Sequence, residues 1–523
     1  MDVEAANLES LSLTPRERVF GFDLRSIALL RIALGLLLMF DAAMRWPDIE
    51  ALYSDSGYFT RSMVDQYFTI FAGTDWKFGT WSLHLFSGDA SWQYTLFAAQ
   101  AVCGAFLTVG LLTRVSMIAA WVLVASAQIR GPLVITAGDF ILKVMLFWSI
   151  FLPLSRYWSI DRMIKAKLHR SPESAAEPTW FVSWATTGYL IQVVVIYFCT
   201  GQAKWNEIWF SGNAMFYVLH LDIFCRPGSR ELLEYPLLLK LISWGTLFIE
   251  AVFVWFLLSP WCTTTWRVLN MFAYWSFHLG ILLSMSIGLF PWICIALWLP
   301  LIPTGFWNWI LGAQKQSLLT FSFTGARQFA WQTIEGICLV MIGLTVFWNL
   351  ANIEQLGLVG NRIPSPVRVL ARVTAVDQRF QMFGVPPKLS PFFVYEARLK
   401  DQAKVDLFRP GHQVSFEMPK SVLRTIPTHN WRQLHRNLTN DFGLPFRAPL
   451  LDYQVRRWNA SHGEQRQVVE AKLHCFLHET GPDYESLSLA SSIWKTWKDP
   501  SAAPGSLFDD LSDRLQNAPT LPY

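Results

Sequence analysis

The sequence predicts a polytopic α-helical membrane bundle of about nine spans, followed by a small α+β extramembrane domain. The 523-residue chain is 52% hydrophobic, with 26 Trp and 39 Phe, and only 16% charged, so it is more apolar than a soluble protein of this length requires. Several apolar stretches approach the ~20 residues that one membrane-crossing helix needs. Near residue 366 the composition changes to that of a soluble domain.

The charge and the cysteines exclude several classes of protein. The net charge of +4 is small and unevenly placed, so it carries information about topology and does not indicate nucleic-acid binding. The seven cysteines show neither CxxC nor Cys/His metal spacing, and we expect no metal site. Five of them lie in or beside apolar spans, where cysteine is usually a small packing residue. Cys225 and Cys475 lie in polar segments, and the sequence leaves open whether they form a disulfide.

The N-terminal part begins with residues 1–22, a polar segment that we expect to be cytoplasmic. The apolar run over residues 24–44 is too long and too interrupted for a cleaved signal sequence, so we interpret it as the first span. A polar segment follows, with amphipathic helices expected around SMVDQYF and WSLHLF. Further spans are expected at about 91–112, 115–135 and 139–155.

The strongest topological signal is the segment RYWSIDRMIKAKLHR, whose five basic residues favour the cytoplasmic side. Counting back from it places the N-terminus in the cytoplasm, and counting forward makes the fifth span, 181–200, end on the opposite side. Later spans are expected at about 235–258 and 328–350, with two more in the block 264–303, which Gly288 and Pro291 interrupt. This count defines a membrane domain over residues 23–352 and places everything after it outside the cytoplasm.

The extracytoplasmic α+β domain is expected over residues 366–499. FFVYEARL and KVDLFRP alternate as strands around a turn at residues 400–404, QVVEAKLHCFLHE alternates as a strand, and VSFEM is a further candidate strand. HNWRQLHRNL and RAPLLDYQVRRWN have the pattern of helices. The tail, residues 500–523, is rich in Pro, Ala, Ser and Asp and is expected to be disordered.

Lys204 is the candidate functional residue that the pattern singles out. The preceding run from Phe181 to Phe198 contains no charged residue, and Lys204 follows the last apolar turn, directly before Trp205. An ammonium group is costly against lipid, so this lysine either extends to the membrane surface or lies in a protein pocket. In a pocket, desolvation would lower its pKa towards that of a useful base. On the pattern alone, the surface position is the more common outcome.

Other ionisable residues lie in or near the expected spans. Asp41 and Arg45, and likewise Asp139 and Lys143, are four residues apart and could pair on one helix face, which favours a structural role for all four. Glu250 and Glu335 must be either protonated or paired, and His278 is a lone mid-span histidine that more often hydrogen-bonds between helices. No phosphate-binding loop, dinucleotide fingerprint or nucleophile elbow is present.

Four segments in the same order resemble one family. They are SIALLRIALGLLLMFDAAMRWPDIEALYSDSGYFTR, GDFILKVMLFWSIFLPLSRYWSID, GQAKWNEIWFSGNAM and SFHLGILLSMSIGLFPW, and RFQMFGVPP and VDLFRPG follow them. Together they resemble the vitamin K-dependent γ-carboxylase-like membrane proteins, also called the HTTM family. The resemblance covers about residues 24–420.

The resemblance implies a reaction and a site. In the carboxylase, a lysine after the fifth span deprotonates reduced vitamin K, and Lys204 occupies that place. The oxygenated quinol becomes an epoxide and supplies a base that removes a glutamate γ-proton, and CO2 then traps the carbanion. By the same resemblance Trp205 and Trp209 would line the quinol pocket, and His278 falls on a family histidine. Asp139 stands nearest the place of a second family histidine and is taken as a quinol-binding candidate.

Three functions follow as hypotheses. The first is a membrane enzyme, an epoxidase and carbon–carbon lyase acting on vitamin K or another quinol with O2 and CO2, Lys204 as base and His278 in support. Its partners would be membrane lipid and a peptide or protein with glutamate side chains. The second is a non-enzymatic membrane scaffold or maturation factor that keeps the fold. A quinone or lipid transporter is weaker, because no internal repeat is evident. An enzyme requires a desolvated Lys204, whereas a scaffold is compatible with a solvated one.

Overall fold

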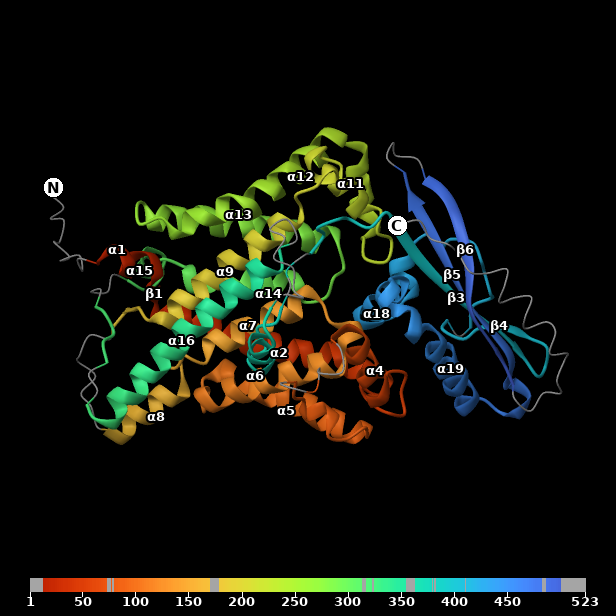
Figure 1. Cartoon of the computed structure of the whole chain (residues 1–523), viewed down its shortest axis with the longest axis horizontal. Coiled ribbons are helices and arrows are strands. Elements are labelled where there is room, and N and C mark those ends of the chain that lie inside the picture. The colour runs from red at the N-terminus through yellow and green to blue at the C-terminus, as the bar shows by residue number, and fades with distance from the viewer. Residues whose placement is uncertain are drawn as a thin grey trace.

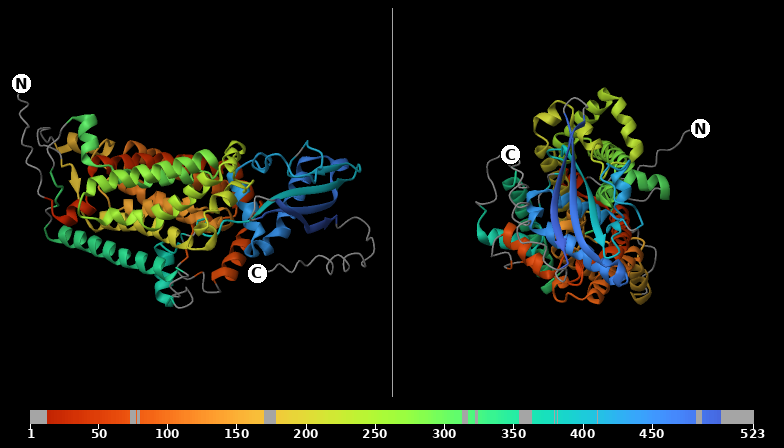
Figure 2. Two further views of the ribbon diagram at one scale, coloured as in Figure 1. Left: turned by 90° about the horizontal axis from the view of Figure 1, so that it is seen from above. Right: turned by 90° about the vertical axis from the view of Figure 1, so that its right-hand side faces the viewer.

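The computed structural model describes residues 13–72, 77, 80–169, 178–312, 317–321, 324–353, 363–378, 380, 382–409, 411–481 and 486–499. The tail at 500–523 and the first twelve residues of the N-terminal segment lie outside this set, so the expectation of a disordered tail stays a prediction. The molecule is elongated, with a helical bundle at one end and a β-sheet backed by two helices at the other (Figures 1 and 2).

The first half of the bundle is built on α2 (Leu24–Arg45), which packs along α5 (Ala90–Val109). Gly35 of α2 and Gly104 of α5 face each other, and a Cβ atom on either would collide with the other helix's backbone, so glycine permits this close approach. The remaining helices of this half are α1 (Pro15–Phe20), α3 (Ile49–Tyr53), α4 (Arg61–Ala72), α6 (Thr113–Arg130), α7 (Ala137–Ser149) and α8 (Ile160–His169).

The second half is organised around α9 (Trp184–Ala203), which packs against α7, α12 (Pro236–Ala251) and α16 (Ala326–Ala351). Ser183 and Thr186 form a capping box at its start, and Glu335 of α16 accepts a hydrogen bond from the N–H of Trp184 at 2.9 Å, so Glu335 is partnered. The other helices are α10 (Glu207–Phe210), α11 (Ala214–Leu219), α13 (Thr263–Ser284), α14 (Phe290–Leu297) and α15 (Thr304–Leu311). Two short strands, β1 (Phe22–Asp23) and β2 (Trp180–Phe181), pair at the end of the bundle near α1.

The expected number of spans is wrong. Among the described residues, four helical segments are long and apolar enough to cross a membrane, namely Leu24–Tyr53, Trp184–Ala203, Pro236–Leu258 and Ala326–Ala351. A fifth is added if Phe290–Leu301 and Thr304–Leu311, bent by 87°, form one broken span. The segments expected at 91–112, 115–135 and 139–155 are helical, but polar residues such as Gln93, Gln100 and Gln128 make the first two less apolar, and α7 is too short.

The C-terminal domain contains a four-stranded antiparallel sheet of order β4-β3-β5-β6. Its strands are β3 (Leu389–Leu399), β4 (Lys404–Asp406), β5 (Val468–Thr480) and β6 (Ser486–Lys498), and its helices are α18 (His429–Thr439) and α19 (Leu444–Ser461). Helix α17 (Ser365–Val373) packs instead against α16, and its Ala371 belongs to the core of the bundle. The expected strands around the 400–404 turn and the two expected helices are therefore confirmed. The VSFEM segment is not a strand, because Phe416 instead packs over the sheet against the rings of His474 and Phe476.

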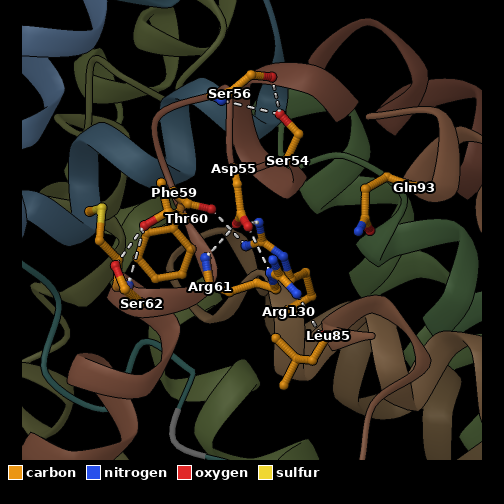
Figure 3. A network of polar contacts seen from close by, with 12 residues as sticks. Ser54, Asp55, Ser56, Phe59, Thr60, Arg61, Ser62, Leu85, Gln93 and Arg130 are labelled. Atoms are coloured by element: carbon orange, nitrogen blue, oxygen red, sulfur yellow. Dashed lines mark hydrogen bonds and ion pairs between the residues drawn. The ribbon is translucent and has the colours of Figure 1, made fainter. Parts of the chain in front are cut away.

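A polar network holds α4 at the end of the bundle that faces this domain (Figure 3). Asp55 accepts hydrogen bonds from the backbone N–H and Nε of Arg61 at 2.8 and 2.7 Å, and its own N–H donates to the carbonyl of Gly88 at 2.8 Å. Arg130, fully buried, donates to the carbonyl of Phe59 at 2.6 Å. The carboxylate thus caps the start of α4, which is a structural role.

All seven cysteines are free, so Cys225 and Cys475 do not form a disulfide. Cys225 lies in a small core cluster with Phe216 and Leu239, and its Sγ lies 3.1 Å from the hydroxyl of Ser229. Cys475 is buried in β5. Both therefore act as packing residues, as do the buried Cys199, Cys294 and Cys338, whereas Cys262 is exposed.

Candidate active site

Lys204, at the end of helix α9, lies inside the protein and not at the membrane surface. Lys204 is the C-cap residue of α9 and is 2% exposed. Gly201, one turn earlier, lies so close to α12 that a Cβ atom there would come within 2.7 Å of the backbone nitrogen of Ala251. This close approach of the two helices sets Lys204 beside Glu250 of α12.

Lys204 and Glu250 form a buried ion pair with an Nζ–Oε2 distance of 2.6 Å, and each side chain is 2% exposed. The ammonium group also donates to the carbonyls of Met382 at 3.0 Å and Thr200 at 3.4 Å. Its Nζ lies 5.2 Å from the centre of the Trp209 ring, within the range of a cation–π interaction. Of the two sequence alternatives, the protein pocket is therefore the one observed.

The chain that follows the last membrane helix covers this pair. Trp209 Nε1 donates to the carbonyls of Phe383 at 3.0 Å and Gly384 at 2.9 Å, and Asn206 Nδ2 donates to Gly384 at 2.8 Å. A Cβ atom on Gly384 would approach the carbonyl oxygen of Ala203 to 2.9 Å, so the absence of a side chain lets this strip lie on the end of α9. We call residues 382–384 the covering strip.

The two candidate tryptophans differ in burial. Trp209 is 2% exposed and lies over Lys204. Trp205 is 54% exposed and packs edge-on against Phe210, so it does not line the buried pair. The separation follows from α10, whose single turn directs Trp209 inward and leaves Trp205 before it on the surface.

His278 of α13 lies in a second buried group, which joins α13 to α9. Its Nε2 is 2.9 Å from the hydroxyl of Tyr197 on α9, and that hydroxyl also accepts from Trp298 Nε1 at 3.1 Å. The ring of Tyr274 packs against the rings of Tyr197 and Trp298, with centroid–centroid distances of 4.0 and 4.5 Å. His278 therefore hydrogen-bonds between helices. Tyr197 precedes Lys204 by seven residues, which is ~10 Å along the axis of α9.

Asp139 belongs to a third group, centred on Arg45. Arg45 donates to Asp41 at 2.9 Å, so the first expected pair is confirmed, and it donates to the hydroxyl of Tyr53 at 2.6 Å. It also forms an ion pair with Asp139. The expected partner of Asp139 is wrong, because Lys143 lies 4.0 Å from Asp377. Asp139 pairs with Arg45 because one guanidinium group can bond several carboxylates at once.

The sequence pattern indicates Lys204, and the family resemblance adds Trp209, but neither identifies the groups that hold them. Glu250 is recognisable from the sequence as an acid that needs a partner, without an indication of which one, and no pattern assigns a role to Tyr197. RFQMFGVPP, whose Met382, Phe383 and Gly384 form the covering strip, carries only the family resemblance. The roles assigned to Lys204, His278, Asp139, Trp205 and Trp209 stay predictions. No group of three or more His, Cys, Asp or Glu side chains that could hold a metal occurs within the described parts of the chain.

Comparison with known proteins identifies the family. The model of the HTTM domain matches residues 21–307, which is more than half of the chain. No curated protein and no solved structure matches. The matched region includes α2 to α14 and therefore Lys204, Glu250 and His278. With its apolar helices and its domain match, this chain is a membrane protein and belongs to the HTTM domain family, the group that resembles the γ-carboxylases.

Proposed function

We propose that the protein is a membrane-embedded enzyme that oxidises vitamin K or another quinol, with Lys204 as the base. The observation that carries this proposal is the Lys204–Glu250 pair at 2.6 Å, 2% exposed and covered by residues 382–384. A lysine that only anchored a helix would reach solvent or headgroups. A lysine excluded from water and given a proton acceptor is equipped for proton transfer.

Glu250 gives Lys204 a way to become neutral. Keeping two opposite charges away from water is costly, and moving the proton from Nζ to Oε2 replaces them with an amine and a carboxylic acid. The neutral amine is the form that can accept a proton from a phenolic hydroxyl. The carbonyls of Met382 and Thr200 hold Nζ in place in either state. We therefore assign Glu250 as the positioning and proton-sharing partner of Lys204.

Aromatic rings of the kind that a flat apolar ligand packs against lie over Lys204 and, ~10 Å away along α9, around Tyr197. Trp209 lies over Nζ, and α9, α13 and α14 bring together the rings of Tyr197, Tyr274, Phe290 and Trp298. Aromatic rings pack well against a quinol ring and exclude water from it. When bound, a quinol would supply the reducing equivalents for O2, giving an epoxide and water. His278 and Tyr197 would then provide hydrogen bonds near the ligand, which assigns them a supporting role.

Carboxylation of a glutamate side chain with CO2 is the finer part of the proposal. It would make the protein a carbon–carbon lyase whose partner is a peptide or protein with glutamate side chains. The support is the family to which the chain belongs, together with an extramembrane domain packed against the bundle on the side of the covering strip.

We also propose that the N-terminus is cytoplasmic and that the C-terminal domain is extracytoplasmic. Support for this orientation no longer depends on counting spans. Helix α8, with its basic residues Arg162, Lys165 and Lys167, lies at the same end of the bundle as α1, and the sheet lies at the opposite end (Figure 1). Cysteines introduced into the 400–404 turn should react with an impermeant reagent in intact cells. Protection of those cysteines would reverse the orientation.

The reaction is tested by supplying reduced naphthoquinone to the purified protein under air and measuring the epoxide. Wild type should form it, whereas Lys204→Ala and Lys204→Arg should not, because arginine keeps the charge but cannot act as a base. Lys400→Ala, in an exposed turn, is the matched control and should retain wild-type turnover. Adding a glutamyl peptide and labelled CO2 then tests carboxylation.

No epoxide from folded wild type with naphtho- and benzoquinols would contradict the proposal and favour the scaffold or maturation factor. Epoxide formation that persists in Lys204→Ala would keep the enzyme but reject its base. Epoxide without carboxylated peptide would retain quinol oxidation and reject the carboxylase step.

A further inference from the structure

Three segments far apart in the sequence meet where the bundle joins the C-terminal domain. They are the loop after α11, the break between α13 and α14, and the first turn of α18. The N–H of Ser286 donates to the carbonyl of Phe224 at 2.7 Å, and the N–H of Arg226 donates to Ser284 at 2.9 Å. Arg432 of α18 donates through Nη2 to the hydroxyl of Ser286 at 3.2 Å. The junction thus brings together two arginines.

Neither arginine is neutralised within the described parts of the chain. Arg432 is 8% exposed, and its Nε has no hydrogen-bond acceptor. Arg226 is exposed and donates only weakly, through Nε to the carbonyl of Met285 at 3.4 Å. No carboxylate of a described residue forms an ion pair with either one. A buried, incompletely bonded guanidinium usually has an anionic partner.

The carboxylates around the junction are each bound elsewhere. Asp48 accepts from Thr428 at 2.7 Å and from Asn430 at 2.8 Å. Asp222 pairs with Arg230, and Asp139 pairs with Arg45. These acids therefore serve their own partners and leave an excess of positive charge between Arg226 and Arg432.

His429, the first residue of α18, lies near Arg432 with both ring nitrogens buried and without partners. Its ring packs against Gly288, where φ is 65° and a Cβ atom would come within 2.6 Å of the ring. Burial, and then the charge of Arg432, lower the pKa of His429 to about 3. Burial, and then the charge of Arg226, lower the pKa of Arg432 to about 10. In both cases burial is the larger cause, and the charge of a neighbouring arginine adds to it.

We propose that Arg226 and Arg432 bind the phosphate group of an anionic membrane lipid. Guanidinium groups are established phosphate ligands. The lipid as the source follows from α13, whose last turns expose the apolar side chains of Leu279 and Leu283 (48% and 68%) directly before Ser284. Acyl chains along these residues would place a headgroup beside Arg226.

This site lies outside the proposed reaction and does not depend on it. Its consequence is structural, because one phosphate would connect the α13–α14 break to α18 and so join the bundle to the extramembrane domain. Ser284 follows His278 by six residues, ~9 Å along α13. A bound lipid would therefore also fix the end of the helix that carries His278.

The test is the melting temperature of the delipidated, detergent-purified protein during titration with dihexanoyl phosphatidic acid. In wild type the melting temperature should rise with ligand concentration, because a ligand that binds only the folded state stabilises it. The Arg226→Gln/Arg432→Gln variant should bind at least roughly tenfold more weakly, since it loses two charge-assisted contacts. Arg457→Gln, an exposed arginine on α19, is the matched control and should bind like wild type.

Three further titrations distinguish the source of the anion. Dihexanoyl phosphatidylcholine should have little effect, and inorganic phosphate and a short glutamyl peptide should have none at the same concentration. An equal response to inorganic phosphate, or a response to the peptide alone, would reject the lipid. An unchanged response in the double variant would reject the site. If that variant fails to fold, Arg226→Gln alone, at an exposed side chain, should still weaken binding roughly tenfold.

Discussion

Among the charged residues buried in the bundle, the Arg45 group and the Lys204 group differ in how their atoms are bonded. Arg45 donates to Asp41 and to the hydroxyl of Tyr53, and it pairs with Asp139. The two carboxylates have further donors, since Gln100 donates to Asp41 at 2.9 Å and the hydroxyl of Thr136 donates to Asp139 at 2.7 Å. Lys204, by contrast, has one carboxylate, Glu250, and two backbone carbonyls.

The bonding of the two groups indicates which buried charge is suited to chemistry. The guanidinium of Arg45 does not release its proton, and its network joins α2, α3 and α7 through bonds that each need the charged state. The amine of Lys204 can release a proton to its single acid, after which both groups are neutral. Burial is common to the two groups, so burial alone does not identify the candidate active site. The feature that distinguishes the site is the one-to-one pairing of Lys204 with Glu250.

The largest expected effect comes from removing one acid in each group. Glu250→Gln should lower epoxide formation by roughly 10²- to 10⁴-fold, because Lys204 loses its proton acceptor. Asp139→Asn should change turnover per folded molecule by less than about threefold, since Asp41 still holds Arg45. Turnover of both variants is measured with reduced naphthoquinone and normalised to folded protein by size-exclusion chromatography.

A larger loss of turnover in Asp139→Asn than in Glu250→Gln would contradict this distinction between the two groups. If Asp139→Asn abolished turnover in folded protein while Glu250→Gln did not, Asp139 would belong to the quinol site, as the family resemblance suggests. Lys204 would then be the structural residue of the two.

The second prediction concerns stability. Glu250→Gln leaves the ammonium of Lys204 buried without a carboxylate and should cost about 3–5 kcal/mol. Lys204→Met/Glu250→Leu removes both charges and should recover most of that loss while remaining inactive. Arg45→Met/Asp139→Leu should not recover, because Asp41 and Tyr53 lose their shared partner. Thermal unfolding in one detergent measures all of these variants. Equal recovery in the two double variants would show that the groups do not differ.

The sequence predicts some of the charged residues in the two groups but not all of their partners. Lys204 is conspicuous in the sequence because it is the first charged residue after an uncharged, mostly apolar run that begins at Phe181, and the pairing of Asp41 with Arg45 follows from helical spacing. Glu250 could not be assigned to Lys204, because a contact between helices depends on the close approach at Gly201 and not on spacing along the chain. The pairing of Asp139 failed for the same reason, since Arg45 reaches it from another helix.

Composition also misjudged the spans, although it predicted the bundle. Helices that are buried among other helices, such as α5 and α6, carry glutamine and arginine side chains that find partners inside the protein. Such helices look like weak membrane spans in a hydropathy profile. The strand alternation of the C-terminal domain was easier to recognise, because it depends only on the two faces of a sheet.

The third prediction tests the hydrogen bond between His278 of α13 and Tyr197 of α9. His278→Ala should lower turnover by roughly 10- to 100-fold if the ring supports the ligand, while the melting temperature changes little. Tyr197→Phe is the matched control, because it removes the same 2.9 Å hydrogen bond but keeps the histidine. Comparable losses of stability and turnover in both variants would make His278 a helix-packing residue.

The smallest expected effect is a pH dependence in the extramembrane domain, where a buried polar pair carries no charge at all. His435 is 1% exposed and its Nε2 lies 2.6 Å from the hydroxyl of Tyr395. Burial lowers the pKa of His435 from 6.5 to about 3. The unfolded chain therefore binds a proton that the folded chain does not, so the stability present above pH 6.5 is lost as the pH falls towards 3.

One pH unit below 6.5, the loss from His435 should be about 1.4 kcal/mol. Thermal unfolding at pH 7.5 and pH 5.5 measures it, with wild type compared to His435→Gln, which keeps a polar side chain beside Tyr395 but does not titrate. The decrease in melting temperature should be smaller in the variant, and other titrating groups cancel in the difference. An equal decrease would mean that His435 is protonated in the folded protein. Its contact with Tyr395 would then have to tolerate a buried charge, as the Arg45 and Lys204 groups do.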